Sequence, residues 1–126
     1  MANKKEYLEF VSGWLAPLGE ISARSMMGGH VLYCDGVVFA LVSHNALYLK
    51  AGDETRGRFE ALGLAAFQPF PDKPGTMPYY LPPAEFFEDS EVMEEWGREA
   101  VEAGRRAQAR RKPKAARKTR PAGKSK

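Results

Sequence analysis

Two turns of the same kind, one strand apart, constrain the fold of this chain more than any other feature. Asp35-Gly36 and His44-Asn45 each lie between runs of residues that favour strands. Such dipeptides adopt the positive backbone dihedrals of a two-residue type I′ hairpin. The segment from His30 to Lys50 is therefore predicted to form three consecutive antiparallel strands, and Ile21 to Met27 a further strand before them.

These turns also predict which side chains share a face of the sheet. Two-residue loops pair Cys34 with Val37 and Ser43 with Ala46, and successive residues of a strand point to opposite sides. Both faces are then largely apolar. One is predicted to carry Val31, Tyr33, Val38, Ala40, Val42, Leu47 and Leu49. The opposite one is predicted to carry Leu32, Cys34, Phe39, Leu41, Tyr48 and Lys50.

Helices can cover only one of these apolar faces. If they cover the face with Val31 and Val42, the opposite face has to meet solvent, a loop or another chain. An apolar sheet face is seldom left bare on a soluble monomer. We therefore expect a homodimer or a protein partner there. The residues expected to contact it are Leu32, Phe39, Leu41 and Tyr48.

Helical spacing of apolar residues appears at both ends of the folded part. In residues 4–16 the stripe consists of Tyr7, Phe10, Val11, Trp14 and Leu15, and after Ser90 it consists of Val92, Trp96, Ala100 and Ala103. A short helix ending near Leu62 and strands in 65–70 and 76–81 lie between them. The order is helix, three or four strands, helix, two strands, helix. This order predicts an α+β fold with the helices on one face of an antiparallel sheet.

Charge divides the chain into two parts. Residues 1–104 contain eight Lys or Arg and sixteen Asp or Glu, whereas residues 105–126 contain eleven Lys or Arg and no acid. We expect one domain over 1–107 and a basic, disordered tail over 108–126. The longest apolar run, Val37 to Val42, is too short to cross a bilayer, and no export signal is visible. A cytoplasmic protein is expected.

The sequence offers little for catalysis. His30, His44 and Cys34 lack the spacing of a zinc site, and no general base accompanies the cysteine. Gly28-Gly29 lacks the lysine of a phosphate-binding loop and the spacing of a dinucleotide fingerprint. We expect no catalytic, cofactor-binding or metal-binding residue, no cofactor and no enzyme activity.

Several separate blocks of residues resemble the N-terminal domain of the TfoX/Sxy family of competence regulators. The blocks are Arg24 with Met26, Gly28-Gly29, Leu32-Tyr33, Asp35-Gly36, Phe39-Ala40-Leu41, Leu47-Tyr48-Leu49-Lys50, 54–60, 77–80 and Trp96. Met27 stands where Phe is common. The likeness covers roughly residues 5–105, and it implies a fold similar to that of secretion chaperones. Family members that act as competence regulators carry a second, helical domain, where this chain has a charged tail, so a stand-alone form is expected.

Arg24 belongs to the resembling pattern and has two interpretations. It could hold an anionic ligand or a partner's carboxylate, or it could pair with a carboxylate of the domain at a strand end. The tail also has two interpretations, as a nonspecific nucleic-acid contact or as a solubilising extension that folds back onto the acidic domain. The tail residues expected to meet nucleic acid are Arg105, Arg106, Arg110, Arg111, Lys112, Lys114, Arg117, Lys118, Arg120, Lys124 and Lys126.

Two classes of function follow from the sequence. The first is a non-enzymatic regulatory or adaptor protein, linked to transcription or DNA uptake, with a tail that contacts nucleic acid nonspecifically. The second is a small domain that binds a ligand or chaperones a partner and has no role in transcription. Neither class requires a membrane.

Overall fold

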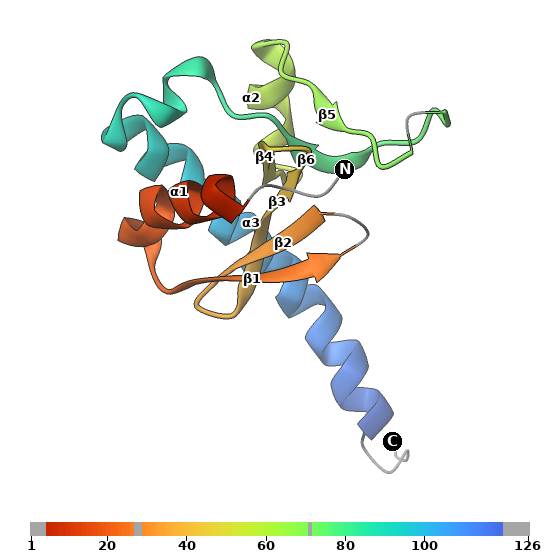
Figure 1. The fold of residues 1–126 in the computed structure, drawn as a ribbon. Coiled ribbons are helices and arrows are strands. Elements are labelled where there is room, and N and C mark those ends of the chain that lie inside the picture. Colours follow the sequence, from red (N-terminus) through yellow and green to blue (C-terminus); the bar gives the residue numbers. More distant parts are fainter. Residues whose placement is uncertain (1–4, 27–28, 71, 120–126) are drawn as a thin grey trace.

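Six antiparallel strands form one sheet in the order β1-β2-β3-β4-β6-β5 (Figure 1). The computed structural model describes residues 5–26, 29–70 and 72–119, with side chains in the last helix described as far as Arg110. The strands are β1 (Ile21–Met26), β2 (Gly29–Cys34), β3 (Val37–Ser43), β4 (Ala46–Lys50), β5 (Ala66–Phe67) and β6 (Met77–Tyr80). The helices are α1 (Lys5–Leu15), α2 (Arg56–Ala61) and α3 (Ser90–Thr119), with 3-10 turns η1 (Ala16–Leu18) and η2 (Ala84–Phe87). The predicted α+β class is confirmed.

Both predicted hairpin turns are present. Asp35 and Gly36 have φ values of 51° and 83°, and His44 and Asn45 have values of 52° and 58°. These positive dihedrals match the right-handed twist of the flanking strands. Cys34 pairs with Val37 and Ser43 with Ala46, as predicted. The turn between β1 and β2 contains Met27 and Gly28, which lie outside the described residues.

The predicted sorting of faces is wrong beyond the middle of β3, because that strand contains a β-bulge. Leu32 pairs with Ala40 while Tyr33 pairs with Val38, so Phe39 is an extra residue opposite the Leu32–Tyr33 step. A bulge of this kind inverts the alternation of the residues that follow it. Phe39 and Ala40 therefore both join the main core, and Leu32 lies there with them.

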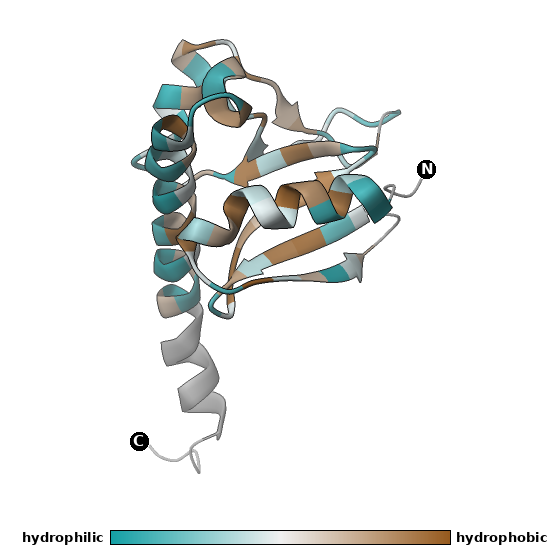
Figure 2. Ribbon diagram, turned by 60° about the vertical axis from the view of Figure 1, so that its left-hand side comes forward, coloured by the Kyte–Doolittle hydropathy of each residue, from teal (hydrophilic) through white to brown (hydrophobic). Residues whose placement is uncertain are grey.

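The main core lies between one face of the sheet and the helices. Its strand residues include Leu32, Phe39, Val42, Leu47 and Leu49, and its helix residues include Val11, Leu15, Met93, Trp96 and Ala100. Figure 2 shows hydrophobic residues concentrated on the strands and hydrophilic ones along the outer side of α3. The predicted stripe of α1 is only partly buried, since the Phe10 side chain is 50% exposed.

Helix α3 crosses the sheet over β3 and then projects beyond it (Figure 1). At Gly104 the helix backbone lies directly on β3, where an added Cβ would stand 2.1 Å from the carbonyl oxygen of Val38. The expected boundary at residue 107 falls inside α3 rather than between two elements. The division into a domain and a tail stays a prediction.

Candidate binding pocket on the outer face

The side of the sheet opposite the main core carries a second, smaller apolar cluster. We call this surface the outer face. Its buried members are Val31, Leu41 and Tyr79, and its partly buried members are Tyr33, Val38, Tyr48, Phe67 and Met77. The bulge produces this set, because it places Leu41 opposite both Val31 and Tyr48 in the ladder.

The outer face is hollowed into a pocket of about 780 Å³. Strands β2, β3, β4 and β6 contribute most of its lining, and the turns of α3 from Gly104 to Arg110 form one wall. The close approach of α3 to β3 at Gly104 brings that wall near the strands. The lining residues are Met26, Val31, Tyr33, Gly36, Val38, Leu41, Lys50, Met77, Tyr79, Gly104, Ala107, Gln108 and Arg110.

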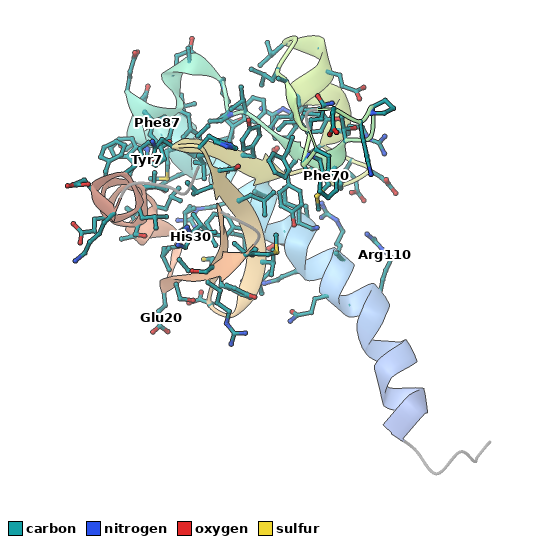
Figure 3. The ribbon with its side chains drawn as sticks, turned by 45° about the vertical axis from the view of Figure 1, so that its right-hand side comes forward. Tyr7, Glu20, His30, Phe70, Phe87 and Arg110 are labelled. Atoms are coloured by element: carbon teal, nitrogen blue, oxygen red, sulfur yellow. The ribbon has the colours of Figure 1, made fainter. Side chains whose placement is uncertain are left out.

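Among the described lining residues, the two charged ones are both cations. The Lys50 Nζ atom lies 4.9 Å from the ring centroid of Tyr79 and donates a hydrogen bond of 3.4 Å to its hydroxyl oxygen. Figure 3 shows the Arg110 side chain extending from α3, and Arg110 lines the pocket. None of the described lining residues is acidic. The pocket is therefore positive, whereas residues 1–104 as a whole contain sixteen acidic and eight basic residues.

Arg24 stands beside the pocket, on the edge strand β1. Its side chain is exposed, and its guanidinium carbon lies 5.7 Å from the ring centroid of Tyr33, which lines the pocket. Within the described residues, no carboxylate forms an ion pair with Arg24. Both interpretations of Arg24 stay predictions.

The structure separates the residues that were expected to share one partner surface. Leu32 and Phe39 have exposures of 0% in the main core, where a partner cannot reach them. Leu41 and Tyr48 do lie on the outer face, and the Tyr48 ring packs 5.0 Å from that of Phe67. The expected partner surface thus keeps Leu41 and Tyr48 and gains Val31, Tyr33 and Val38.

The first three basic residues assigned to the tail contact the domain. Arg105 pairs with Glu102 at 2.5 Å, Arg106 pairs with Glu54 at 3.2 Å, and Arg110 lines the pocket. The side chains of the other eight lie outside the described residues. These are Arg111, Lys112, Lys114, Arg117, Lys118, Arg120, Lys124 and Lys126.

The local environment of Cys34 opposes a nucleophilic role. The thiol is 1% exposed, and its Sγ donates to the carbonyl oxygen of Leu18 at 3.5 Å. Burial raises the pKa of the thiol, and the neighbouring Asp35 carboxylate raises the pKa further. Across the part of the chain that the structure describes, no group of three His, Cys, Asp or Glu is placed to hold a metal ion.

An aromatic and ionic cluster joins α2 to α3, and sequence reasoning missed it. The Arg58 guanidinium lies 4.2 Å from the ring centroid of Trp96, with one nitrogen 2.9 Å from Glu95 and another bonded to Glu99. The ring of Phe59 meets Trp96 edge-on at 5.1 Å. The four-residue spacing of Glu95 and Glu99, on the helix face next to Trp96, was the available signal.

Comparison with known proteins relates this arrangement to one family. The sequence matches the TfoX N-terminal domain over residues 14–104. The chain belongs to the TfoX N-terminal domain family. The matched range runs from α1 to Gly104 and so includes every strand of the sheet.

One curated relative is the DNA transformation protein TfoX1 of Aliivibrio fischeri. It is 41% identical to this chain over 51 residues, which is 40% of this chain and 24% of the relative. The matched segment thus spans about a quarter of that protein. Among the residues described, no helix has both the length and the apolar character needed to cross a membrane.

Proposed function

We propose that this chain is a non-enzymatic regulatory or adaptor protein that acts in the cytoplasm. Its outer face binds a partner, which is another protein or a second copy of the chain, and its basic tail contacts nucleic acid without reading sequence. The observation that carries the proposal is membership of the TfoX N-terminal domain family, together with the likeness to a DNA transformation protein. That likeness favours a role in regulating transcription or DNA uptake.

The charge distribution supports the nucleic-acid contact. The eight basic residues of 111–126 follow a domain in which acidic residues predominate, and no aromatic residue lies among them. Such a segment neutralises phosphates, and it lacks the aromatic side chains that stack on bases. The tail therefore supplies affinity, and any specificity belongs to the domain's partner.

A second candidate function has its own supporting observation. The outer face holds a pocket of about 780 Å³, a size that suits a small ligand. A domain that binds a ligand or chaperones a partner, with no role in transcription, would use this pocket and would not need the tail. The two candidates differ in whether nucleic acid is required.

Nucleic-acid binding by the tail is tested with fluorescently labelled duplex and single-stranded DNA of unrelated sequences. We expect the full chain to bind all of them at low salt. A chain ending at Arg110 should lose this binding. A full-length variant with Gln at the eight basic positions of 111–126 separates charge from chain length, and it should also fail to bind. Equal binding by the three proteins would refute the role of the tail.

The two candidate functions are distinguished by recovering partners from lysate with and without nuclease. A partner that is not recovered after nuclease treatment, and is not recovered by the chain that ends at Arg110, supports the nucleic-acid-tethered role. A partner that is recovered in both cases supports the ligand- or partner-binding domain. Its binding site is then tested with purified components and variants of the outer face.

A further inference from the structure

We propose that the outer-face pocket binds a small amphiphilic anion, with an alkyl or aryl body and one carboxylate or sulfonate head group. This inference rests on the second candidate function, a domain that binds a ligand at the outer face, and it names the class of molecule that enters the pocket. It gives the apolar strands and the two cations of the pocket a common ligand.

The dimensions of the pocket favour a small molecule. Its volume of about 780 Å³ lies within the range of roughly 300–1,000 Å³ that is typical of ligand pockets. The apolar side chains at its base are already largely covered within a single chain, since Val31, Leu41 and Tyr79 are 8%, 4% and 6% exposed. A concave site therefore remains open, rather than a broad flat surface of the kind that large protein interfaces use.

The lining suits an apolar body of variable shape. Val38 on β3 supplies half-buried aliphatic surface, and the more deeply buried Val31 and Leu41 form the apolar base of the pocket. Met26 and Met77 add unbranched side chains, which adjust to irregular ligands better than branched ones. Tyr33 and Tyr79 present rings of the kind that pack against aromatic or alkyl groups.

Charge selects the head group. Lys50 and Arg110 enter the pocket from β4 and α3, and the described lining contains no acidic residue. Arg24 extends this positive side through its contact with Tyr33. Because the domain as a whole is acidic, an anion gains favourable interactions at this pocket that most of the domain surface does not offer.

The test uses the intact chain and two probes that share the same rings. Anilinonaphthalene sulfonate is an anion with a fluorescent aryl body, and N-phenylnaphthylamine is its uncharged counterpart. We expect saturable binding of the sulfonate at one site per chain and weaker binding of the amine, by about fivefold or more. Decanoate should displace the sulfonate, and decanol should do so less well.

Two tryptophan substitutions on α3 locate the site. Ala107 lines the pocket, whereas Ala109 is exposed on the same helix and does not line it. Ala107→Trp should fill the pocket and lower the affinity for the sulfonate by about tenfold or more, and Ala109→Trp should leave it unchanged. Thermal unfolding of both variants checks that the fold persists.

Charge substitutions test the head-group contacts. Lys50→Gln and Arg110→Gln should each lower the affinity for the sulfonate by about two- to fivefold and leave the affinity for the amine unchanged. Arg98→Gln is the control, because Arg98 pairs with Glu94 at 3.4 Å and does not line the pocket.

Three results would overturn the proposal: equal binding of the two probes, binding that survives Ala107→Trp, or absence of binding to a folded chain. A dimer that excludes the sulfonate and dissociates on Ala107→Trp would assign the pocket to a second copy instead. DNA binding by the same variants is measured separately. If the chain binds DNA but does not bind the probe, only the small-anion proposal is rejected. If the chain binds the probe but does not bind DNA, only the proposed role of the tail is rejected.

Discussion

Burial of the Cys34 thiol has a consequence for stability at high pH. The unfolded thiol loses its proton near its ordinary pKa of 9.0, while the folded thiol, whose pKa is raised, keeps it. Below that pH both states are protonated, and this group adds no pH dependence. Above it, ionisation of the thiol stabilises the unfolded state relative to the folded state. This lowers the free energy of unfolding by up to about 1.4 kcal/mol per pH unit until the folded pKa is reached.

We therefore expect the free energy of unfolding to fall as the pH rises above 9, and the fall should be smaller in Cys34→Ala. Tyr7 and Tyr80 add to the fall above pH 10.0, because burial also raises their pKa values. Urea unfolding of both proteins at about pH 8 and pH 10 measures the difference. Parallel pH dependences would show that the thiol does not carry the effect.

The bulge makes a sharp distinction between two aromatic residues that the sequence placed on the same face. Phe39→Ala should lower the free energy of unfolding by about 3–5 kcal/mol, because Phe39 is fully buried in the main core. Tyr48→Ala removes a half-buried ring from the outer face and should cost about 1–2 kcal/mol. Urea unfolding compares them, with Phe39→Leu as the milder substitution. Equal costs would contradict the assignment of faces.

The position of a single residue can be predicted from the sequence only when its own chemistry and that of its sequence neighbours determine it. Asp35 and Asn45 reveal their turns because their positive φ values follow from their own chemistry and that of their neighbours. Leu32 and Phe39 carry no such signal, since an apolar residue in a strand is compatible with either face of the sheet. Leu41 and Tyr48 lie on the outer face and Arg24 lies beside it, and their role as partner or ligand contacts stays a prediction. Ala107 and Gln108 gave no sign in the sequence of lining a pocket.

Among the elements, β3 shows where sequence patterns stop being informative. The run Val37-Val38-Phe39-Ala40 contains neither glycine nor proline to mark an irregular strand. The bulge accompanies the contact between the Val38 carbonyl and Gly104, which is 66 residues away in the chain. For β5 the sequence pattern predicted too long a strand. Of the predicted segment 65–70, only Ala66–Phe67 forms a strand.

Two glycine substitutions in helices should have opposite effects. Gly104→Ala would place a Cβ against the Val38 carbonyl, and overpacking of this kind costs about 1–3 kcal/mol. Gly13→Ala in α1 meets nothing within 4 Å and should stabilise the chain by about 0.5–1 kcal/mol through higher helix propensity. Thermal unfolding measures both. A stabilising Gly104→Ala would show that α3 does not press against β3 in solution.

For the molecule as a whole, charge segregation predicts a steep dependence of nucleic-acid binding on salt. The slope of log K against log salt concentration should be about −0.7 to −0.9 for each phosphate that the tail neutralises. Lys114→Gln and Lys118→Gln should each reduce the magnitude of this slope by the contribution of one phosphate contact, about 0.7–0.9. DNA titrations at about 50–200 mM salt measure this slope. Slopes that differ between DNA sequences of equal length would contradict a tail that reads no bases.

The overall architecture was the most predictable level of description. Helical stripes in α1 and α3, two I′ turns and the blocks shared with the TfoX N-terminal domain all indicate the same α+β fold. The pocket was not predictable, because it requires the bulge, the position of β6 beside β4 and the packing of α3 at Gly104 together. Each of these features depends on residues far apart in the chain, so no short segment of sequence predicts it.

Helix α3 belongs to both of the proposed binding surfaces at once. Ala107 and Arg110 form a wall of the pocket, and the same helix continues to Thr119 with basic residues in its last turns. If occupancy of the pocket changes how α3 lies on β3, it also changes the affinity of the tail for its ligand. Thermodynamic reciprocity then requires the tail's ligand to alter the affinity of the pocket by the same factor.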